Sequence, residues 1–366
     1  MSAAGPAAGA PTRTPTRDGR SATSSFQVLA AEALVVPTGI LAAALVTRTL
    51  GASGYGLFTL ALAIVLASEN VLASFFGRAT IKLVSEASDP RPVAAAAGRL
   101  YVALGLAGML ALWAAAEPLA RLFDAPRFAV LLRIAALDLP ATALSRSLRD
   151  TLVGLGRFEQ RARAAAVRWS SRLLFIALAV FAGLGVEGAL AACVAATLLE
   201  AWASRTGLGL LTASTAGFPL SRLLAYSLPL LVHGLGISLF ARLDLYALKA
   251  LGSDAATVGL YAAAGNAAGS FQFAAVVLSP LLLSTLSRRL ADGRLREARA
   301  LVRDALRFAL LAIPFAAIAA GAAPELLRLV YGAGFESAAP VMRLLMVAAA
   351  AHVVAGISIG AVVAAG

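Results

Sequence analysis

Long apolar stretches constrain the fold of this chain more than any other feature of its sequence. About 20 consecutive apolar residues are enough to cross the hydrocarbon core of a bilayer as a helix. The sequence contains ten such stretches, at residues 26–47, 56–77, 98–117, 128–148, 169–187, 188–206, 223–249, 259–286, 306–328 and 338–362. Only 14% of the residues are charged, against roughly 25% in soluble domains. The sequence therefore predicts an all-α, polytopic membrane helix bundle.

Basic residues lie almost entirely on one side of the predicted spans. The chain carries a net charge of +12, and 23 of its 31 Lys and Arg residues fall in segments that share a side when the amino terminus is placed in the cytoplasm, against five on the other side. Cytoplasmic loops are enriched in Lys and Arg, so we expect a cytoplasmic amino terminus, contact with membrane lipids and a location in the cytoplasmic membrane. The same distribution argues against nucleic acid as a partner, because the basic residues punctuate spans.

A small glycine-containing motif occurs twice in the chain. Leu50-Gly51 matches Leu251-Gly252, and residues 118–128 match residues 325–335, which aligns Arg121 with Arg328 and Phe128 with Phe335. Two echoes in the same order at nearly the same spacing indicate an internal duplication. Repeats with an even number of spans are parallel and are related by an axis along the membrane normal.

The duplication divides the chain into segments. Residues 1–25 are expected to be a disordered cytoplasmic tail, because they are poor in large apolar residues. Residues 26–207 are the predicted N-lobe with helices one to six, residues 208–222 a cytoplasmic linker, and residues 223–366 an incomplete C-lobe with helices seven to ten. We expect a C-terminally truncated second lobe, with about ten helices of twelve or more.

Four further stretches carry a family resemblance. They are "VTRTLGASGYGLFTLA" (46–61), "GRATIKLVSE" (77–86), "RLDLYALKALGSDAATVGLYAAA" (242–264) and "LVYGAGFESAAPVMRLL" (329–345). In this order and spacing they resemble the oligosaccharide flippases of polysaccharide biosynthesis, in the multidrug, oligosaccharidyl-lipid and polysaccharide exporter superfamily. The resemblance implies alternating access between two lobes, which moves a polyprenyl-pyrophosphate-linked oligosaccharide to the outer leaflet. It also implies polysaccharide-assembly proteins as partners.

Ionisable residues inside spans are costly and usually face a cavity or a partner. We predict that Glu69, Asp138 and Asp244 couple transport to sodium or protons, with a static pair between lobes as the alternative. The predicted substrate-binding residues are Arg242, Arg133, Arg343, Asn266 and Gln272. Arg242 is the choice for the anionic pyrophosphate, because a guanidinium holds phosphate in two-point contact; the alternative for all three arginines is snorkelling.

Other polar residues are expected to have ordinary roles. Glu32 and Glu200 lie near the inner ends of their spans, where water can reach. Asp244 should need a partner on another helix, because it is nearly opposite Arg242 on its own. The segments 157–172 and 287–307 have the basic and apolar spacing of helices that lie on an anionic leaflet.

Two other functions stay open. A drug or small-cation exporter of the same superfamily is favoured if the cavity is dominated by carboxylates and disfavoured if it is strongly cationic. A membrane glycan polymerase or glycosyltransferase is the third reading, although the sequence contains neither an Asp-x-Asp motif nor a phosphate loop. One cysteine and two histidines are too few for a zinc site, and no cofactor is expected.

Overall fold

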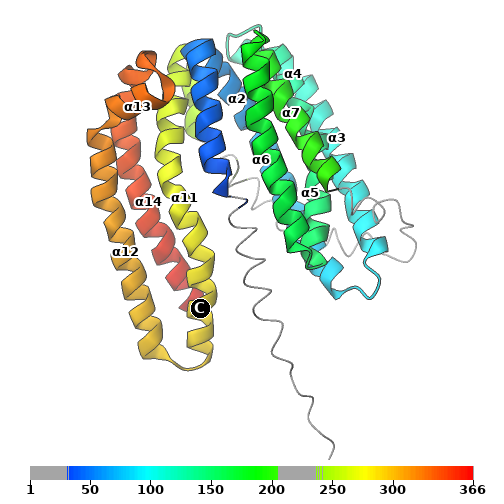
Figure 1. Ribbon diagram of the computed structural model, residues 1–366, viewed down its shortest axis with the longest axis vertical. Coiled ribbons are helices and arrows are strands. Elements are labelled where there is room, and N and C mark those ends of the chain that lie inside the picture. The colour runs from blue at the N-terminus through cyan, green and yellow to red at the C-terminus, as the bar shows by residue number, and fades with distance from the viewer. Residues whose placement is uncertain are drawn as a thin grey trace, which may run out of the picture.

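The computed structural model describes residues 31, 33–204, 236, 238, 240 and 242–365, and this part of the chain contains helices and no strands (Figure 1). The helices are α2 (Val35–Glu86), α3 (Arg91–Leu122), α4 (Phe128–Ala136), α5 (Asp138–Gly154), α6 (Phe158–Phe181), α7 (Gly185–Ala203), α10 (Leu243–Ala250), α11 (Ala255–Ala291), α12 (Leu295–Gly321), α13 (Ala323–Tyr331), the 3₁₀ helix η2 (Ala333–Ala338) and α14 (Ala339–Ala365). Among the described residues, six helices are long and apolar enough to cross a bilayer, and a seventh span results if α12 and α13 are counted together. The predicted all-α polytopic membrane bundle is confirmed.

Helix α2 is two antiparallel arms joined at Gly51. The backbone of Gly51 has φ 67° and ψ −174°, a conformation that glycine adopts without steric cost. Thr38 and Leu66 line the same cavity, although a straight helix would separate them by about 40 Å. The arms correspond to the predicted helices 26–47 and 56–77. The predicted loop between them is wrong, because the helix resumes directly after Gly51.

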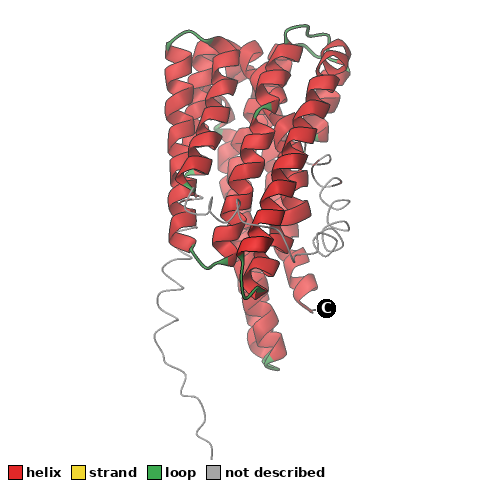
Figure 2. Cartoon of the chain, turned by 90° about the vertical axis from the view of Figure 1, so that its right-hand side faces the viewer, coloured by secondary structure: helices red, strands yellow, loops and turns green. Residues whose placement is uncertain are grey.

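The helices form two groups with the arms of α2 between them. One group contains α3 to α7 and the other contains α10 to α14 (Figure 1). The groups approach each other at the end that holds the Gly51 bend and α13, which we call the convergent end. They separate at the end that holds the α5–α6 and α11–α12 turns, the divergent end, and Figure 2 shows the helices running along the axis between these ends. The described basic segments, residues 78–99, 146–172 and 288–307, lie toward the divergent end.

Helix α12 differs from the predicted helix 306–328. It begins earlier, at Leu295, and ends at Gly321, where α13 continues at an angle of 72°. Pro324 stands in the first turn of α13, and because proline has no backbone N–H it cannot continue the hydrogen bonding of α12. The predicted surface helices are also wrong. Residues 287–307 are the ends of α11 and α12 with a turn between them, and residues 158–172 are the first half of α6.

Two glycines make a backbone contact between α2 and α11. A Cβ atom added to Gly56 would lie 2.0 Å from the carbonyl oxygen of Ala255, and one added to Gly259 would lie 2.0 Å from the carbonyl oxygen of Ala52. Small residues let membrane helices approach to backbone contact. The contact therefore requires glycine on both α2 and α11.

Aromatic residues and one arginine complete the convergent end. The ring of Tyr55 packs against the rings of Tyr331 and Phe335, each at a centroid distance of 6.1 Å. Arg48 donates a hydrogen bond from Nη2 to the carbonyl oxygen of Leu329. The convergent end is thus closed by residues of α2 and of the α10–α14 group.

The repeated motif has a visible structural basis. Gly51 and Gly252 both have positive φ, 67° and 96°, and both stand at bends at the convergent end. Phe128 and Phe335 are both buried next to a second aromatic ring. The equivalence of the two lobes stays a prediction. The tail 1–25, the linker 208–222 and most of the predicted helix 223–249 lie outside the described residues.

We expect Gly56→Ala and Gly259→Ala to destabilise the protein by about 1–3 kcal/mol, because the methyl group must push two backbones apart. The measurement is thermal unfolding of the purified protein in detergent. Gly356→Ala on α14 is the matched control, since a Cβ there meets nothing within 4 Å, and it should unfold at the wild-type temperature or above it. Wild-type stability in Gly56→Ala would contradict the backbone contact.

Candidate functional site: a cationic cavity beneath the convergent end

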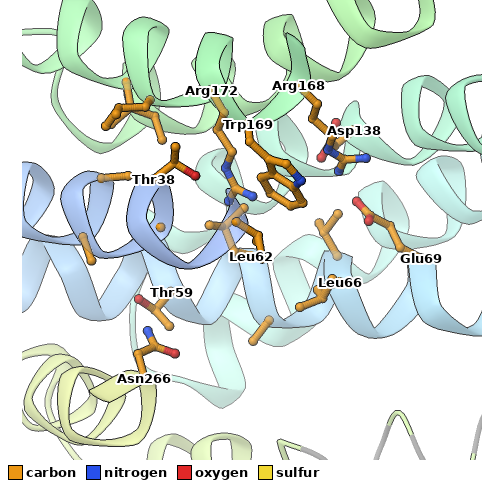
Figure 3. A pocket seen from close by; sticks show the side chains of 18 of the residues that line it. Thr38, Thr59, Leu62, Leu66, Glu69, Asp138, Arg168, Trp169, Arg172 and Asn266 are labelled. Carbon is orange, nitrogen blue, oxygen red and sulfur yellow. The ribbon is translucent and has the colours of Figure 1, made fainter. Parts of the chain in front are cut away.

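A cavity of about 520 Å³ lies between the two arms of α2 and helices α5 and α6. Figure 3 shows Arg172 and Trp169 reaching from α6 toward the arms of α2, with Glu69 and Asp138 at one side and Asn266 of α11 at the other. Arg242, which precedes α10, also lines it. The cavity therefore receives residues from both groups of helices.

Positive charge dominates the cavity wall. Six arginines and three carboxylates line it, namely Arg146, Arg149, Arg161, Arg168, Arg172, Arg242, Glu69, Asp138 and Asp150. Residues three or four apart share one face of a helix, which is why the spacing on α5 and α6 directs the arginines to one side. Arg163 falls on the other side of α6 and pairs there with Glu159.

One buried carboxylate holds two of these arginines. Glu200 of α7 is fully buried, and its Oε2 lies 3.1 Å from Nη1 of Arg168 while its Oε1 lies 3.4 Å from Nη1 of Arg149. The predicted water-exposed position of Glu200 is therefore wrong. Because one carboxylate faces two guanidinium groups, the cluster keeps an excess positive charge and ties α5, α6 and α7 together.

Buried donors face this cluster without a partner among the described residues. They are the Nε atoms of Arg146, Arg149 and Arg168 and the Nε1 atom of Trp169. Arg168 and Arg172 also lie over the ring of Trp169, at 5.4 and 6.0 Å from its centroid. Guanidinium groups bind oxyanions, so the excess of arginines in this wall is suited to an anion with several oxygen acceptors.

Two carboxylates lie together at one side of the cavity, with Arg168 beside Asp138 (Figure 3). Thr142 donates a hydrogen bond of 3.1 Å from Oγ1 to Oε1 of Glu69, and Asp138 lies next to Glu69 in the same buried space (Figure 3). The Oδ1 atom of Asp138 has no hydrogen-bond partner in the described part of the chain. The structure thus brings the two predicted carboxylates together.

A second cavity of about 530 Å³ adjoins the first on the side of α10 and α11, and both are lined by Arg242 and Asn266. Tyr261 donates a hydrogen bond from its hydroxyl group to Oδ2 of Asp244. Asn266 donates one of 2.8 Å from Nδ2 to the hydroxyl oxygen of Tyr55. The prediction that Asp244 has its partner on another helix is confirmed.

The predicted site residues are only partly brought together. Arg242, Asn266, Asp244, Glu69 and Asp138 line the two adjoining cavities. Two predicted arginines lie elsewhere. Arg133 pairs with Glu117 at 3.1 Å on an exposed surface, and Arg343 donates to the carbonyl oxygen of Ala320. Neither lines the cavities, so the structure favours the snorkelling alternative for both. The side chain of Gln272, and Glu32, lie outside the described residues.

Sequence reasoning missed the arginines of α5 and α6. It counted residues 146–172 as a cytoplasmic segment and used them for orientation, whereas five of its arginines lie in the cavity wall with Trp169. The helical spacing of Arg161, Arg168 and Arg172 is the signal that could have identified this face. Without these residues, the predicted cytoplasmic segments still contain more Lys and Arg residues than the predicted outer loops.

Solved structures with the same fold are transporters. This chain superposes on an inward-facing multidrug resistance MATE family transporter of the MOP superfamily with a TM-score of 0.63 and 13% identity, over 93% of this chain and 87% of that one. It superposes on the outward-facing conformation of such a transporter with a TM-score of 0.58 and 14% identity, over 94% of this chain and 84% of that one. It superposes on a mutant of the Vibrio cholerae MATE transporter VcmN with a TM-score of 0.53 and 17% identity, over 95% of this chain and 86% of that one. A comparison with curated proteins gives no match.

The helix bundle and its central polar cavity place the protein in the class of polytopic membrane proteins with the MOP-superfamily transporter fold. The family model described as polysaccharide biosynthesis protein matches residues 45–340. The chain belongs to this family, and the predicted resemblance is confirmed.

We expect Glu200→Gln to lower the stability by about 3–5 kcal/mol, because it leaves Arg149 and Arg168 buried without a negative partner. Thermal unfolding in detergent measures this. The matched control is Glu159→Gln, whose exposed pair with Arg163 should contribute little. Equal unfolding temperatures for the two variants would show that the buried cluster does not hold the three helices together.

Proposed function

We propose that this protein moves a polyprenyl-pyrophosphate-linked oligosaccharide from the inner to the outer leaflet by alternating access. The observation that carries this proposal is the cationic cavity, in which six arginines face three carboxylates. A pyrophosphate presents several anionic oxygens, and guanidinium groups bind phosphate oxygens in bidentate geometry. The family match agrees with this substrate class.

The physical requirement on such a carrier supports the same proposal. A glycan cannot cross about 30 Å of hydrocarbon without a polar path, whereas a polyprenyl tail can remain in the lipid. The cavity supplies polar groups along the arms of α2, and the convergent end closes it with Tyr55, Gly56 and Gly259. With the basic segments placed in the cytoplasm, this arrangement is the inward-open state of the transport cycle.

A second candidate function is export of drugs or small cations. It is favoured by the names of the superposed transporters and by the carboxylates Glu69 and Asp138 in the cavity. The excess of arginines weighs against it, because a cationic wall repels a cationic substrate. We therefore place it second.

Arg146 and Arg172 are the arginines with which to test the proposal. Both line the cavity, and neither forms the buried pair with Glu200. We expect Arg146→Gln and Arg172→Gln each to slow the flipping of a polyprenyl-pyrophosphate-linked sugar in reconstituted vesicles by about 10- to 100-fold, the effect of losing one charge-assisted hydrogen bond. Flipping is measured by the loss of sugar accessible to a lectin outside the vesicle.

The control is Arg163→Gln, the same substitution on the exposed face of α6, which should flip at the wild-type rate. Efflux of a lipophilic cation is measured in the same vesicles. Unchanged flipping in both cavity variants would refute the anion-binding wall, and cation efflux without flipping would establish the second candidate instead.

We further propose that Glu69 and Asp138 couple transport to sodium or protons. Two neighbouring buried carboxylates repel each other when both are ionised, which favours uptake of a cation between them. We expect Glu69→Gln and Asp138→Asn to abolish the acceleration of flipping by an imposed ion gradient, while binding of the lipid substrate stays within about twofold. Gradient-driven acceleration that survives in both variants would assign the pair a purely structural role.

A further inference from the structure

The two adjoining cavities differ in charge. The first has six arginines against three carboxylates, whereas the second is lined by Arg242 and Asp244 as its only charged residues among those described. An anion is therefore attracted to the α5–α6 side. An uncharged group has no such attraction to give up, so it can lie on the α10–α11 side.

The second cavity presents hydrogen-bonding groups of both kinds. Asp244 is fixed by the hydroxyl group of Tyr261 and by the backbone N–H of Leu245, and a carboxylate has about four acceptor sites in total. Asn266 uses one amide hydrogen on Tyr55 and keeps its carbonyl oxygen and its second amide hydrogen. Asn70 adds another amide from α2. Paired hydroxyl donors and acceptors on a sugar ring match such a surface.

Two glycines keep this cavity wide. Gly265 and Gly269 are one helical turn apart on α11 and line the cavity, and a Cβ added to either meets nothing within 4 Å. Helix packing thus does not require glycine at these two positions, whereas it does at Gly56 and Gly259. The free space above them lies in the cavity, where a ring can lie flat against the helix.

We infer that the second cavity is the glycan subsite, in which Asp244, Tyr261, Asn266 and Asn70 bind the first sugar of the substrate while the arginines of α5 and α6 hold its pyrophosphate. This inference rests on the proposed function and extends it. Arg242 and Asn266, which line both cavities, stand where the sugar joins the phosphate. Asp244 then acts in substrate recognition.

The experiment compares two probes on the purified full chain in lipid nanodiscs. One is polyprenyl pyrophosphate without sugar, and the other is the same lipid carrying a single N-acetylhexosamine. We expect the wild type to bind the glycosylated lipid at least about fivefold more tightly, the effect of one or two hydrogen bonds. Gly269→Leu should remove this difference by filling the cavity, and Asp244→Ala should reduce it to about twofold or less. Both variants should bind the bare lipid within twofold of the wild type.

Gly356→Leu is the matched control, because Gly356 on α14 also has open space around it and does not line the cavity. It should keep the wild-type preference. A wild type that binds both lipids equally, or a Gly269→Leu variant that keeps the preference, overturns the glycan subsite alone. Failure of the wild type to bind either lipid overturns the proposed function as well.

Discussion

The close approach of α2 and α11 at Gly56 and Gly259 is the contact on which the rest of the structure depends. It places backbone against backbone, and so fixes the distance between α2 and the α10–α14 group at one end. Only at that distance does Asn266 reach Tyr55 and does Tyr55 pack against the rings of Tyr331 and Phe335. The cavities below the contact exist because the helices separate from this point.

The fold also gives the two adjoining cavities different charge. On α5 and α6, Glu200 neutralises part of a dense arginine cluster, and this makes burial of Arg149 and Arg168 tolerable. Among the described residues, no such cluster lines the cavity at α10 and α11, where Asp244 accepts a hydrogen bond from a tyrosine. The two adjoining cavities therefore offer different chemistry to one substrate. The wall on α5 and α6 is strongly charged, whereas the wall on α10 and α11 offers mainly hydrogen-bonding groups.

Most of the helices could be predicted from the sequence, because the length of an apolar run directly reports a membrane span. The repeated glycine motif could be recognised equally well, because Gly51 and Gly252 occupy backbone conformations that other residues rarely adopt. The need of Asp244 for a partner followed from helix geometry alone. These features share a local cause, so a stretch of sequence contains all the information that decides them.

The cavity wall could not be predicted in the same way. Whether Arg149 and Arg168 are loop charges or buried ones is decided by Glu200, which belongs to a different helix. The bend between α12 and α13 was missed because the apolar run continues through it, although Pro324 marks the position. Burial of charge depends on partners distant in sequence, and a count of basic residues per segment contains no information about them.

The glycine contact has a consequence for its own reversal. The carbonyl groups of Ala52 and Ala255 lie four residues before the amides of Gly56 and Gly259 in the same helices, the spacing of an internal helical hydrogen bond. Parting α2 from α11 would therefore strand none of these four groups, and mainly dispersion forces and a few side-chain bonds resist it. A helix contact of this kind can open and close many times in lipid, where breaking a polar interface would cost too much free energy.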